Sequence, residues 1–223
     1  MAVKRIVAPE RFIQAVADTK VTDGSTSVRP GATTLEYDGD MYITYDGANW
    51  VPKLDTVRGK LKTVSVSKPL ASLGSYAAYD VMSNSTASGT SWGFTAVGRA
   101  NGAYGYVTKA RIVSDTTGKV FRPTMFLFNA IPVGAALNDN ALNLSVAGTD
   151  SAKYIGKIDW VATETLNSGA SEAVATPSTY GNLPLVFECN SGADDLFGVL
   201  VTRDAIALGT GGTVTVALTV EQY

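Results

Sequence analysis

The clearest pattern in the chain is an alternation of apolar and polar residues near its C-terminal end. Val214, Val216, Leu218 and Val220 alternate with threonines and with Ala217. Because side chains of a strand point alternately to its two faces, this period of two predicts a strand with one buried face. Comparable β-prone runs are predicted at 61–67, 76–82, 92–97, 104–113, 119–129, 141–147, 153–161, 183–189 and 196–203.

Turn-forming residues separate these runs, and no segment after residue 60 has a convincing helical period. Roughly eight to ten strands with glycine-rich connections predict an all-β fold, a jelly-roll-like β-sandwich over residues 60–223. Pro123 and Pro184 fall inside two of the runs. Proline cannot donate a ladder hydrogen bond, so both are expected at edge strands, strand starts or bulges.

Two further segments precede the sandwich. Residues 1–30 are interpreted as an N-terminal arm, in which Pro9, Glu10, Phe12, Ile13 and Val16 give a weak helical pattern. An arm with so few apolar residues is expected to pack on its own domain or on a partner.

Residues 31–59 are interpreted as a small β-meander with a linker. Asp38-Gly39 and Asp46-Gly47 separate three short β-prone runs, and Asp-Gly is a strong hairpin signal. The aromatic residues expected to form cross-strand pairs are Tyr37, Tyr42, Tyr45 and Trp50. Three strands this short are marginally stable alone, so the meander is expected to dock on another surface.

Composition narrows the classes of function. Of the 223 residues, 45% are hydrophobic and 17% are charged, which is typical of a folded chain with an uncharged polar surface. A net charge of −2 and scattered basic residues provide no footprint for nucleic acid or an anionic membrane. No secretion signal or apolar span of about 20 residues is visible, which favours a protein that is made and folded in a cytoplasm.

Catalytic and metal chemistry have little support in the sequence. The chain has no histidine, which removes the commonest general base and the commonest zinc ligand. Ser65, Ser67 and Lys68 are close in sequence, but strand alternation explains them without a catalytic dyad. Cys189 lies in an apolar alternation and is predicted to be a small core residue. We therefore expect no enzyme activity, no metal and no cofactor.

Carboxylates and aromatic residues leave alternatives open. Asp139 and the pair Asp194 and Asp195 are expected to cap turns. Asp38 and Asp40 have the same interpretation, with a surface calcium site as the alternative. A further set of aromatic residues is expected to fill the core, with sugar stacking as the alternative. Its members are Tyr79, Trp92, Tyr104, Tyr106, Tyr154 and Trp160.

Lys109, Arg111 and Val113 are predicted to share a strand face with Val107, and Arg122 lies on the next run. Arg111 and Arg122 are therefore candidates for an interface between subunits, and two solvated cations are the alternative. The low surface charge of a sandwich with exposed edges also favours an oligomer.

Several segments resemble virion proteins of phages and prophages. They are Tyr106–Ser114, Phe126–Ala130, Asp139–Leu144, Tyr154–Trp160 and Leu196–Thr202. The resemblance is to jelly-roll proteins encoded among head genes and covers about residues 100–220. Separately, residues 36–51 resemble small tyrosine- and tryptophan-bearing hairpins of head-attached and fibre proteins.

The resemblance implies a capsid decoration protein on the exterior of the virion, a homotrimer that binds the lattice of the major capsid protein through its N-terminal part. Candidate capsid-binding residues are Phe12, Ile13, Tyr37, Tyr42, Tyr45 and Trp50. The alternative is a tail-fibre or baseplate protein that binds a host glycan through Trp92, Tyr104 or Tyr106. A cell-wall hydrolase would require a carboxylate pair, which the sequence does not clearly show.

Overall fold

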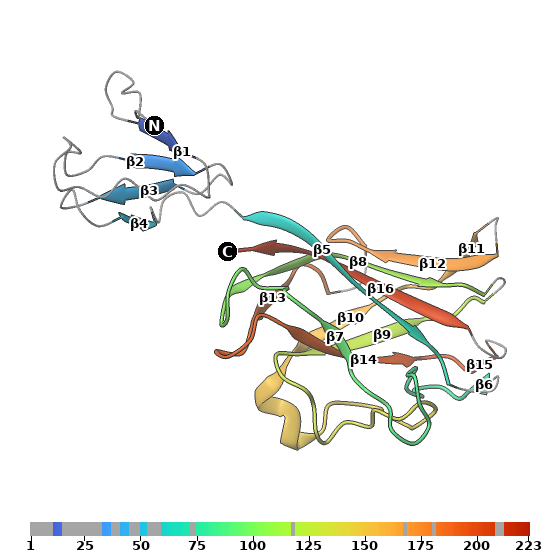
Figure 1. The fold of residues 1–223 in the computed structure, drawn as a ribbon. Helices are drawn as coiled ribbons and strands as arrows, with labels where there is room; N and C mark the ends of the chain where they lie inside the picture. The colour runs from blue at the N-terminus through green and yellow to red at the C-terminus, as the bar shows by residue number, and fades with distance from the viewer. Residues whose placement is uncertain are drawn as a thin grey trace. The chain divides into compact units, whose positions relative to one another are not determined.

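The computed structural model describes residues 59–71, 75–116, 119–166, 169–179, 182–207 and 212–223, and the backbone of four strands within residues 1–58 (Figure 1). The chain divides into two compact units, Met1–Arg58 and Gly59–Tyr223. The second unit is called the body below. In the described residues no helix has the length and apolar character needed to cross a membrane.

The first unit contains a four-stranded sheet with the order β1-β2-β3-β4. Its strands are β1 (Arg11–Gln14), β2 (Thr33–Glu36), β3 (Met41–Thr44) and β4 (Trp50–Pro52). Strands β2, β3 and β4 are successively antiparallel, as the Asp-Gly signals predict. The helical interpretation is wrong at Phe12 and Ile13, which lie in β1, parallel to β2. Pairing with β2 outweighs the weak helical pattern, and the arm and the meander therefore share one sheet.

The body is a sandwich of antiparallel strands with a short 3-10 helix, η2 (Gly148–Lys153). Its principal strands are β5 (Lys60–Pro69), β7 (Trp92–Phe94), β8 (Tyr104–Ser114), β9 (Pro123–Phe128), β10 (Tyr154–Asp159), β12 (Ala170–Ala175), β14 (Leu196–Thr202) and β16 (Thr213–Gln222). Shorter strands are β6 (Ser75–Tyr76), β11 (Glu164–Leu166), β13 (Leu185–Glu188) and β15 (Ile206–Ala207).

The strand order of the body is that of a jelly roll. When the eight principal strands are taken in chain order, the first pairs with the last, β5 with β16, and the second with the seventh, β7 with β14. The third pairs with the sixth, β8 with β12, and the fourth with the fifth, β9 with β10. This nested pairing gives one sheet around β8 and β16 and another around β9 and β14. The predicted fold class is confirmed.

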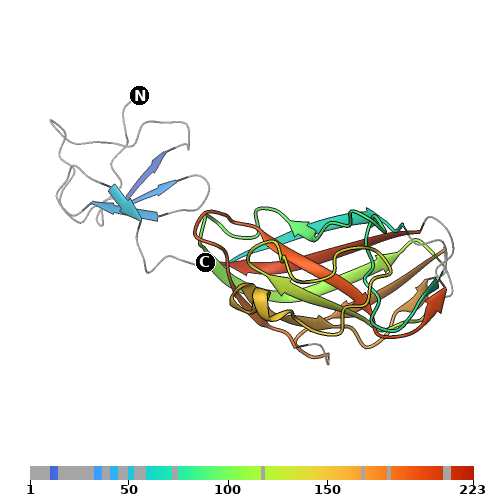
Figure 2. The ribbon, with the colours of Figure 1, turned by 90° about the horizontal axis from the view of Figure 1, so that it is seen from below.

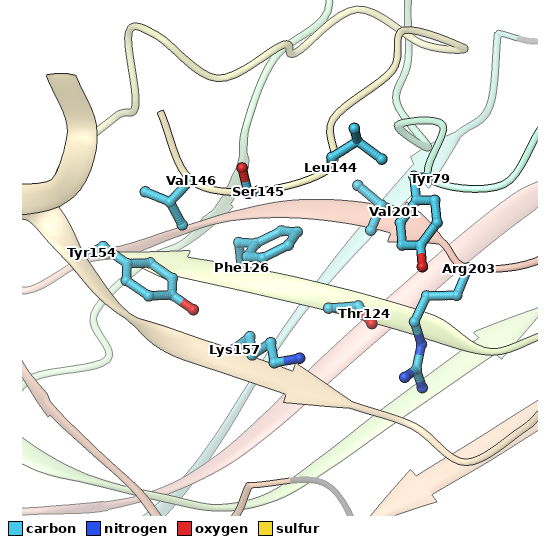
Figure 3. Close-up of a pocket in the computed structure, with 10 residues that line it drawn as sticks. All are labelled: Tyr79, Thr124, Phe126, Leu144, Ser145, Val146, Tyr154, Lys157, Val201 and Arg203. Carbon is cyan, nitrogen blue, oxygen red and sulfur yellow. The ribbon is translucent and has the colours of Figure 1, made fainter. Parts of the chain in front are cut away.

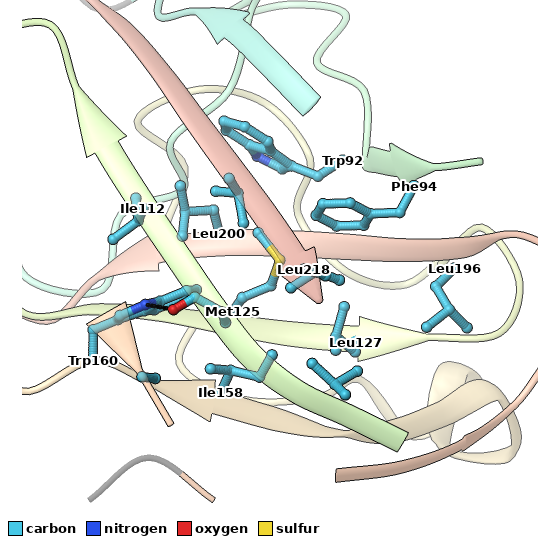
Figure 4. Close-up of a cluster of buried hydrophobic side chains, with 14 of the residues drawn as sticks. Trp92, Phe94, Ile112, Met125, Leu127, Ile158, Trp160, Leu196, Leu200 and Leu218 are labelled. Carbon is cyan, nitrogen blue, oxygen red and sulfur yellow. Dashed lines mark hydrogen bonds between the residues drawn. The ribbon is translucent and has the colours of Figure 1, made fainter. Parts of the chain in front are cut away.

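The main core lies between these two sheets (Figure 4). Trp92 and Phe94 from β7 contribute to the same cluster as Leu218 from β16 and Ile112 from β8. Trp160 is fully buried, and its indole Nε1 donates to the carbonyl oxygen of Ala110 at 3.2 Å. A buried indole needs such a partner, and this bond also ties the end of β10 to the opposite sheet.

The two sheets differ on their outer faces. Strand β9 is buried along its whole length, because residues 129–153 cover the face of its sheet that points away from the core (Figures 1 and 2). Phe126, Phe128, Val199 and Val201 form a second apolar cluster under this cover. The sheet around β8 and β16 has no such cluster in the described residues, and β16 alternates between buried and half-buried positions.

A β-bulge in β8 changes which residues share a face. Thr219 pairs with Lys109 whereas Val220 pairs with Val107, so Thr108 is an extra residue in β8. The bulge puts Val107 in the core, while Lys109 is exposed. The prediction that Val107 shares the face of Lys109 and Arg111 is therefore wrong.

Two other departures from the predicted strands have simple causes. Residues 141–147 alternate like a strand but belong to the cover, where Leu142 makes a single bridge with Asp80. Strand β12 was not predicted, since its inward residues Ser171, Ala173 and Ala175 are too small to give a strong apolar period. The prolines are as expected: Pro123 begins β9, and Pro184 directly precedes β13 and follows a cis peptide bond.

Candidate functional site

A pocket of about 300 Å³ opens between the cover and the sheet that it covers (Figure 3). Ten residues line it: Tyr79, Thr124, Phe126, Leu144, Ser145, Val146, Tyr154, Lys157, Val201 and Arg203. Figure 3 shows Phe126 and Val201 between the side chains of the cover and those of Lys157 and Arg203. The volume of the pocket lies at the lower end of the range for small-molecule sites.

Strand alternation supplies the floor of this pocket. In β9, Met125 and Leu127 point into the main core, so Thr124 and Phe126 point to the opposite, outer face. Val201 reaches the same face from β14. The cover leaves part of this apolar face open, and the opening is the pocket.

Tyr79 forms one side of the pocket and has an uncommon backbone conformation, with φ of 70°. Its amide donates to the carbonyl oxygen of Thr202 at 2.6 Å, and its own carbonyl accepts from the amide of Asn143 at 3.0 Å. A bulky residue at positive φ is strained, and such strain is concentrated at functional sites.

Positive charge is concentrated at one side of the pocket. Lys157 Nζ lies 3.0 Å from an oxygen of Asp159, and Arg203 lies 3.9 Å from the other oxygen. Asp159 is buried, and it also accepts a hydrogen bond from Thr124 Oγ1 at 2.7 Å. Burial alone would raise the pKa of Asp159, but the bonds from Thr124 and Lys157 and the charge of Arg203 lower it. The carboxylate is therefore ionised at neutral pH.

Arg203 has unused hydrogen-bonding capacity. One terminal nitrogen donates to the carbonyl oxygen of Trp160 at 2.9 Å. Its Nε atom is buried and has no hydrogen-bond partner in the described structure. Tyr154, whose ring packs on Phe126 and Phe128, has a pKa raised by burial and by the charge of Asp159. It therefore keeps its proton and remains a hydrogen-bond donor.

The predicted interface cations do not lie together. Arg111 is in β8 and pairs with Glu172 of β12, on the sheet that lacks the cover. Arg122 directly precedes β9 of the other sheet, and its Nε donates to Asp204 at 3.1 Å. The two guanidinium groups therefore lie in different sheets, each with its own carboxylate.

The candidate capsid-binding residues lie in the first unit. Phe12 and Ile13 are in β1, Tyr42 is in β3 and Trp50 begins β4, where the structure describes the backbone alone. Tyr37 and Tyr45, together with the candidate calcium ligands Asp38 and Asp40, lie outside the described residues. The capsid-binding role of these residues therefore stays a prediction.

The Ser-Lys dyad is ruled out by the faces of β5. Ser65 and Ser67 are exposed, while Lys68 points inward with its Nζ 2.8 Å from Thr90 Oγ1. Among the described residues, no group of three or more Asp, Glu or Cys side chains is arranged to hold a metal ion. Cys189 is a buried core residue as predicted, and burial and the nearby Asp194 and Asp195 raise its pKa to about 11.

The aromatic candidates divide between core and surface. Trp92 and Trp160 are core residues, which confirms the preferred interpretation for both. Tyr104 and Tyr106 are instead exposed, on the outer face of β8. Tyr223 stacks on Tyr104 at 6.0 Å between ring centroids and meets the edge of Tyr106 at 6.1 Å. These three tyrosines form an exposed aromatic surface that is separate from the pocket.

Sequence reasoning missed the cationic side of the pocket. Lys157 and Asp159 are two residues apart in one predicted strand, so a shared face was predictable. Arg203 follows β14, and its proximity to β10 depends on the order β10-β9-β14. A single sequence carries no signal for that order.

No protein-family description and no curated protein matches this chain. One solved structure that it resembles is that of the infectious bursal disease virus Gt strain. The identity is 12%, the TM-score is 0.17, and the match covers 83% of this chain and 49% of that chain. The match thus spans about half the length of that viral protein.

Proposed function

We propose that this chain is a decoration protein on the exterior of a tailed-phage capsid. The body would be the exposed part, as a homotrimer, and the first unit would bind the major capsid protein. The observation that carries the proposal is the pairing of a jelly-roll body with a separate four-stranded unit. Jelly rolls are frequent in viral capsid proteins and lectins.

The difference in size between the core of the body and the small sheet of the first unit supports this assignment of roles. The body buries its own large core, with Trp92, Phe94 and Trp160 each at most 1% exposed. The first unit is a sheet of four strands of three or four residues each, and sheets this small gain stability from docking on another surface. On a repetitive lattice, a trimer of such units would bind with high avidity.

Removal of residues 1–58 tests the assignment. We expect the truncated chain to remain folded, with the near-UV circular dichroism of Trp92 and Trp160, and to stop co-sedimenting with capsids that lack the protein. The matched control is full-length Lys109→Gln, which changes an exposed residue of the body. Capsid binding by the truncated chain would contradict the proposal.

The location in the particle tests the function itself. Quantitative mass spectrometry of separated heads and tails should find many copies with the heads. A few copies with the tails would instead favour the receptor-binding alternative. Light scattering of the purified full-length chain should give the mass of three copies, and a monomer at micromolar concentration would contradict the trimer.

A further inference from the structure

The charges around the pocket leave a local excess of one positive charge. Lys157 and Arg203 line the pocket, and the carboxylate beside them is Asp159. The neighbouring Arg122 and Asp204 neutralise each other in a direct ion pair. An anionic group with one negative charge would therefore balance this side of the pocket.

The guanidinium group of Arg203, whose side chain is 24% exposed, marks where such an anion would bind. The planar guanidinium group suits a carboxylate, which accepts hydrogen bonds in the same plane. Lys157, whose side chain is 45% exposed, can turn toward a ligand without unfolding its strand.

The rest of the pocket suits a ring with both apolar and hydroxylated faces. Phe126, Val201, Leu144 and Val146 provide apolar surface. The hydroxyl groups of Tyr79 and Tyr154 point toward the side of Arg203 and Lys157 (Figure 3), and Ser145 also lines the pocket. Inorganic anions would make no use of the apolar surface, whereas a sugar ring has C–H groups for the aromatic faces and hydroxyl groups for the polar ones.

We propose that this pocket binds an acidic sugar, a hexuronic acid residue of a polysaccharide, with its carboxylate at Lys157 and Arg203 and its ring against Phe126 and Tyr154. The pocket is made entirely by the body. The proposal is therefore independent of whether the first unit binds a capsid.

Titration of the full-length chain with glucuronate, followed by NMR of the protein and by calorimetry, tests the proposal. We expect a dissociation constant on the order of 1 mM for the monosaccharide at low salt. Glucose, which has the same ring without the carboxylate, should bind at least about tenfold more weakly. Binding of glucuronate should weaken as salt is added, because the ion pairs are partly exposed to solvent.

Two variants and one matched control assign the binding to the pocket. Lys157→Gln should weaken glucuronate binding about tenfold or more, since a charged hydrogen bond is lost. Ser145→Trp, at an exposed position of the cover, should block the pocket and leave Lys157 in place. Lys109→Gln removes the same charge from the uncovered sheet and should leave binding unchanged.

Other outcomes would overturn the proposal. Equal affinity for glucose and glucuronate would exclude recognition of the acid. Acetate that binds as tightly as glucuronate would exclude recognition of the sugar ring. Tighter binding of a short blocked peptide with a free C-terminal carboxylate would define a peptide site. Full glucuronate binding by both Lys157→Gln and Ser145→Trp would place the binding elsewhere.

Discussion

The two sheets of the body differ in how the outer face of each is kept from exposing apolar side chains to solvent. On the outer face of the sheet of β9 and β14, residues 129–153 cover Phe126, Phe128, Val199 and Val201. The outer face of the sheet of β8 and β16 is mostly polar. Its strands are joined by hydrogen bonds between hydroxyl groups, Ser67 with Thr215 at 2.7 Å and Thr63 with Thr219 at 3.1 Å. Both faces belong to alternating strands, but the side chains of one are buried and those of the other meet solvent.

The difference shows that the side chains on the outer face of a sheet determine whether another segment of the chain or solvent covers that face. Apolar side chains on that face require a cover, and the cover here creates the pocket with its edge. Asp150 holds the cover in place, because its buried carboxylate accepts the amide hydrogens of Val133, Gly134 and Ala135 at 2.8–3.0 Å. The hydroxyl-rich face has no second apolar cluster among the described residues.

Truncation of the covered face should have the largest effect. Phe128→Ala, at a position 1% exposed, should lower the free energy of unfolding by about 3–5 kcal/mol, because it leaves a cavity under the cover. Ser65→Ala, on the exposed face of β5, should change it by less than about 0.5 kcal/mol. Urea unfolding followed by tryptophan fluorescence measures both. Equal losses would show that the two faces do not differ energetically.

Loss of the Asp150 carboxylate should release the cover. Asp150→Asn should cost about 1–3 kcal/mol, because one amide oxygen replaces a charged acceptor of three backbone hydrogen bonds. Hydrogen exchange should accelerate in residues 129–153, and a dye that binds apolar surface should fluoresce. Exchange that accelerates equally in β16 would instead indicate global destabilisation.

The same carboxylate predicts a response to acid. Burial would raise the pKa of Asp150, but the three amide donors and Lys153 lower it below its ordinary value. A lowered folded-state pKa gives stability that is present above the unfolded pKa and is lost as the pH falls through the folded pKa. Acid should therefore loosen the cover, and Asp150→Asn should lack this contribution.

The uncovered sheet buries one charged group on its inner face, the ammonium group of Lys68 in β5. Its Nζ donates to the carbonyl oxygens of Thr90 and Ser91, the latter at 2.9 Å. Burial lowers the pKa of Lys68 from 10.5 to about 8. The unfolded chain therefore binds more protons between these values, and this group makes stability rise from about pH 8 to 10.5. Lys68→Met should lack this rise. A Lys68→Met variant whose free energy of unfolding still rises from about pH 8 to 10.5 would contradict the assignment to Lys68.

The smallest effect is expected at the exposed ion pair of the uncovered sheet. Arg111→Ala should change the free energy of unfolding by about 1 kcal/mol or less, because solvent screens its pairing with Glu172. Arg111→Glu places two like charges side by side and tests the predicted interface by light scattering. An unchanged oligomeric mass would exclude Arg111 from that interface.

The sequence by itself determined the all-β fold, the hairpin signals of the first unit and the positions of most body strands. Those signals are local, since a period of two and an Asp-Gly turn depend on neighbouring residues. Val214, Val216, Leu218 and Val220 are fully buried as their alternation predicts.

Tertiary structure alone decided which strands became neighbours. The pairing of β1 with β2, the bulge at Thr108 and the position of the 141–147 segment in the cover depend on strands distant in sequence. The pocket depends on them as well, because Lys157, Arg203 and Tyr79 come from three separate segments. Alternation specifies which side chains share a face, but packing between distant segments determines what that face meets.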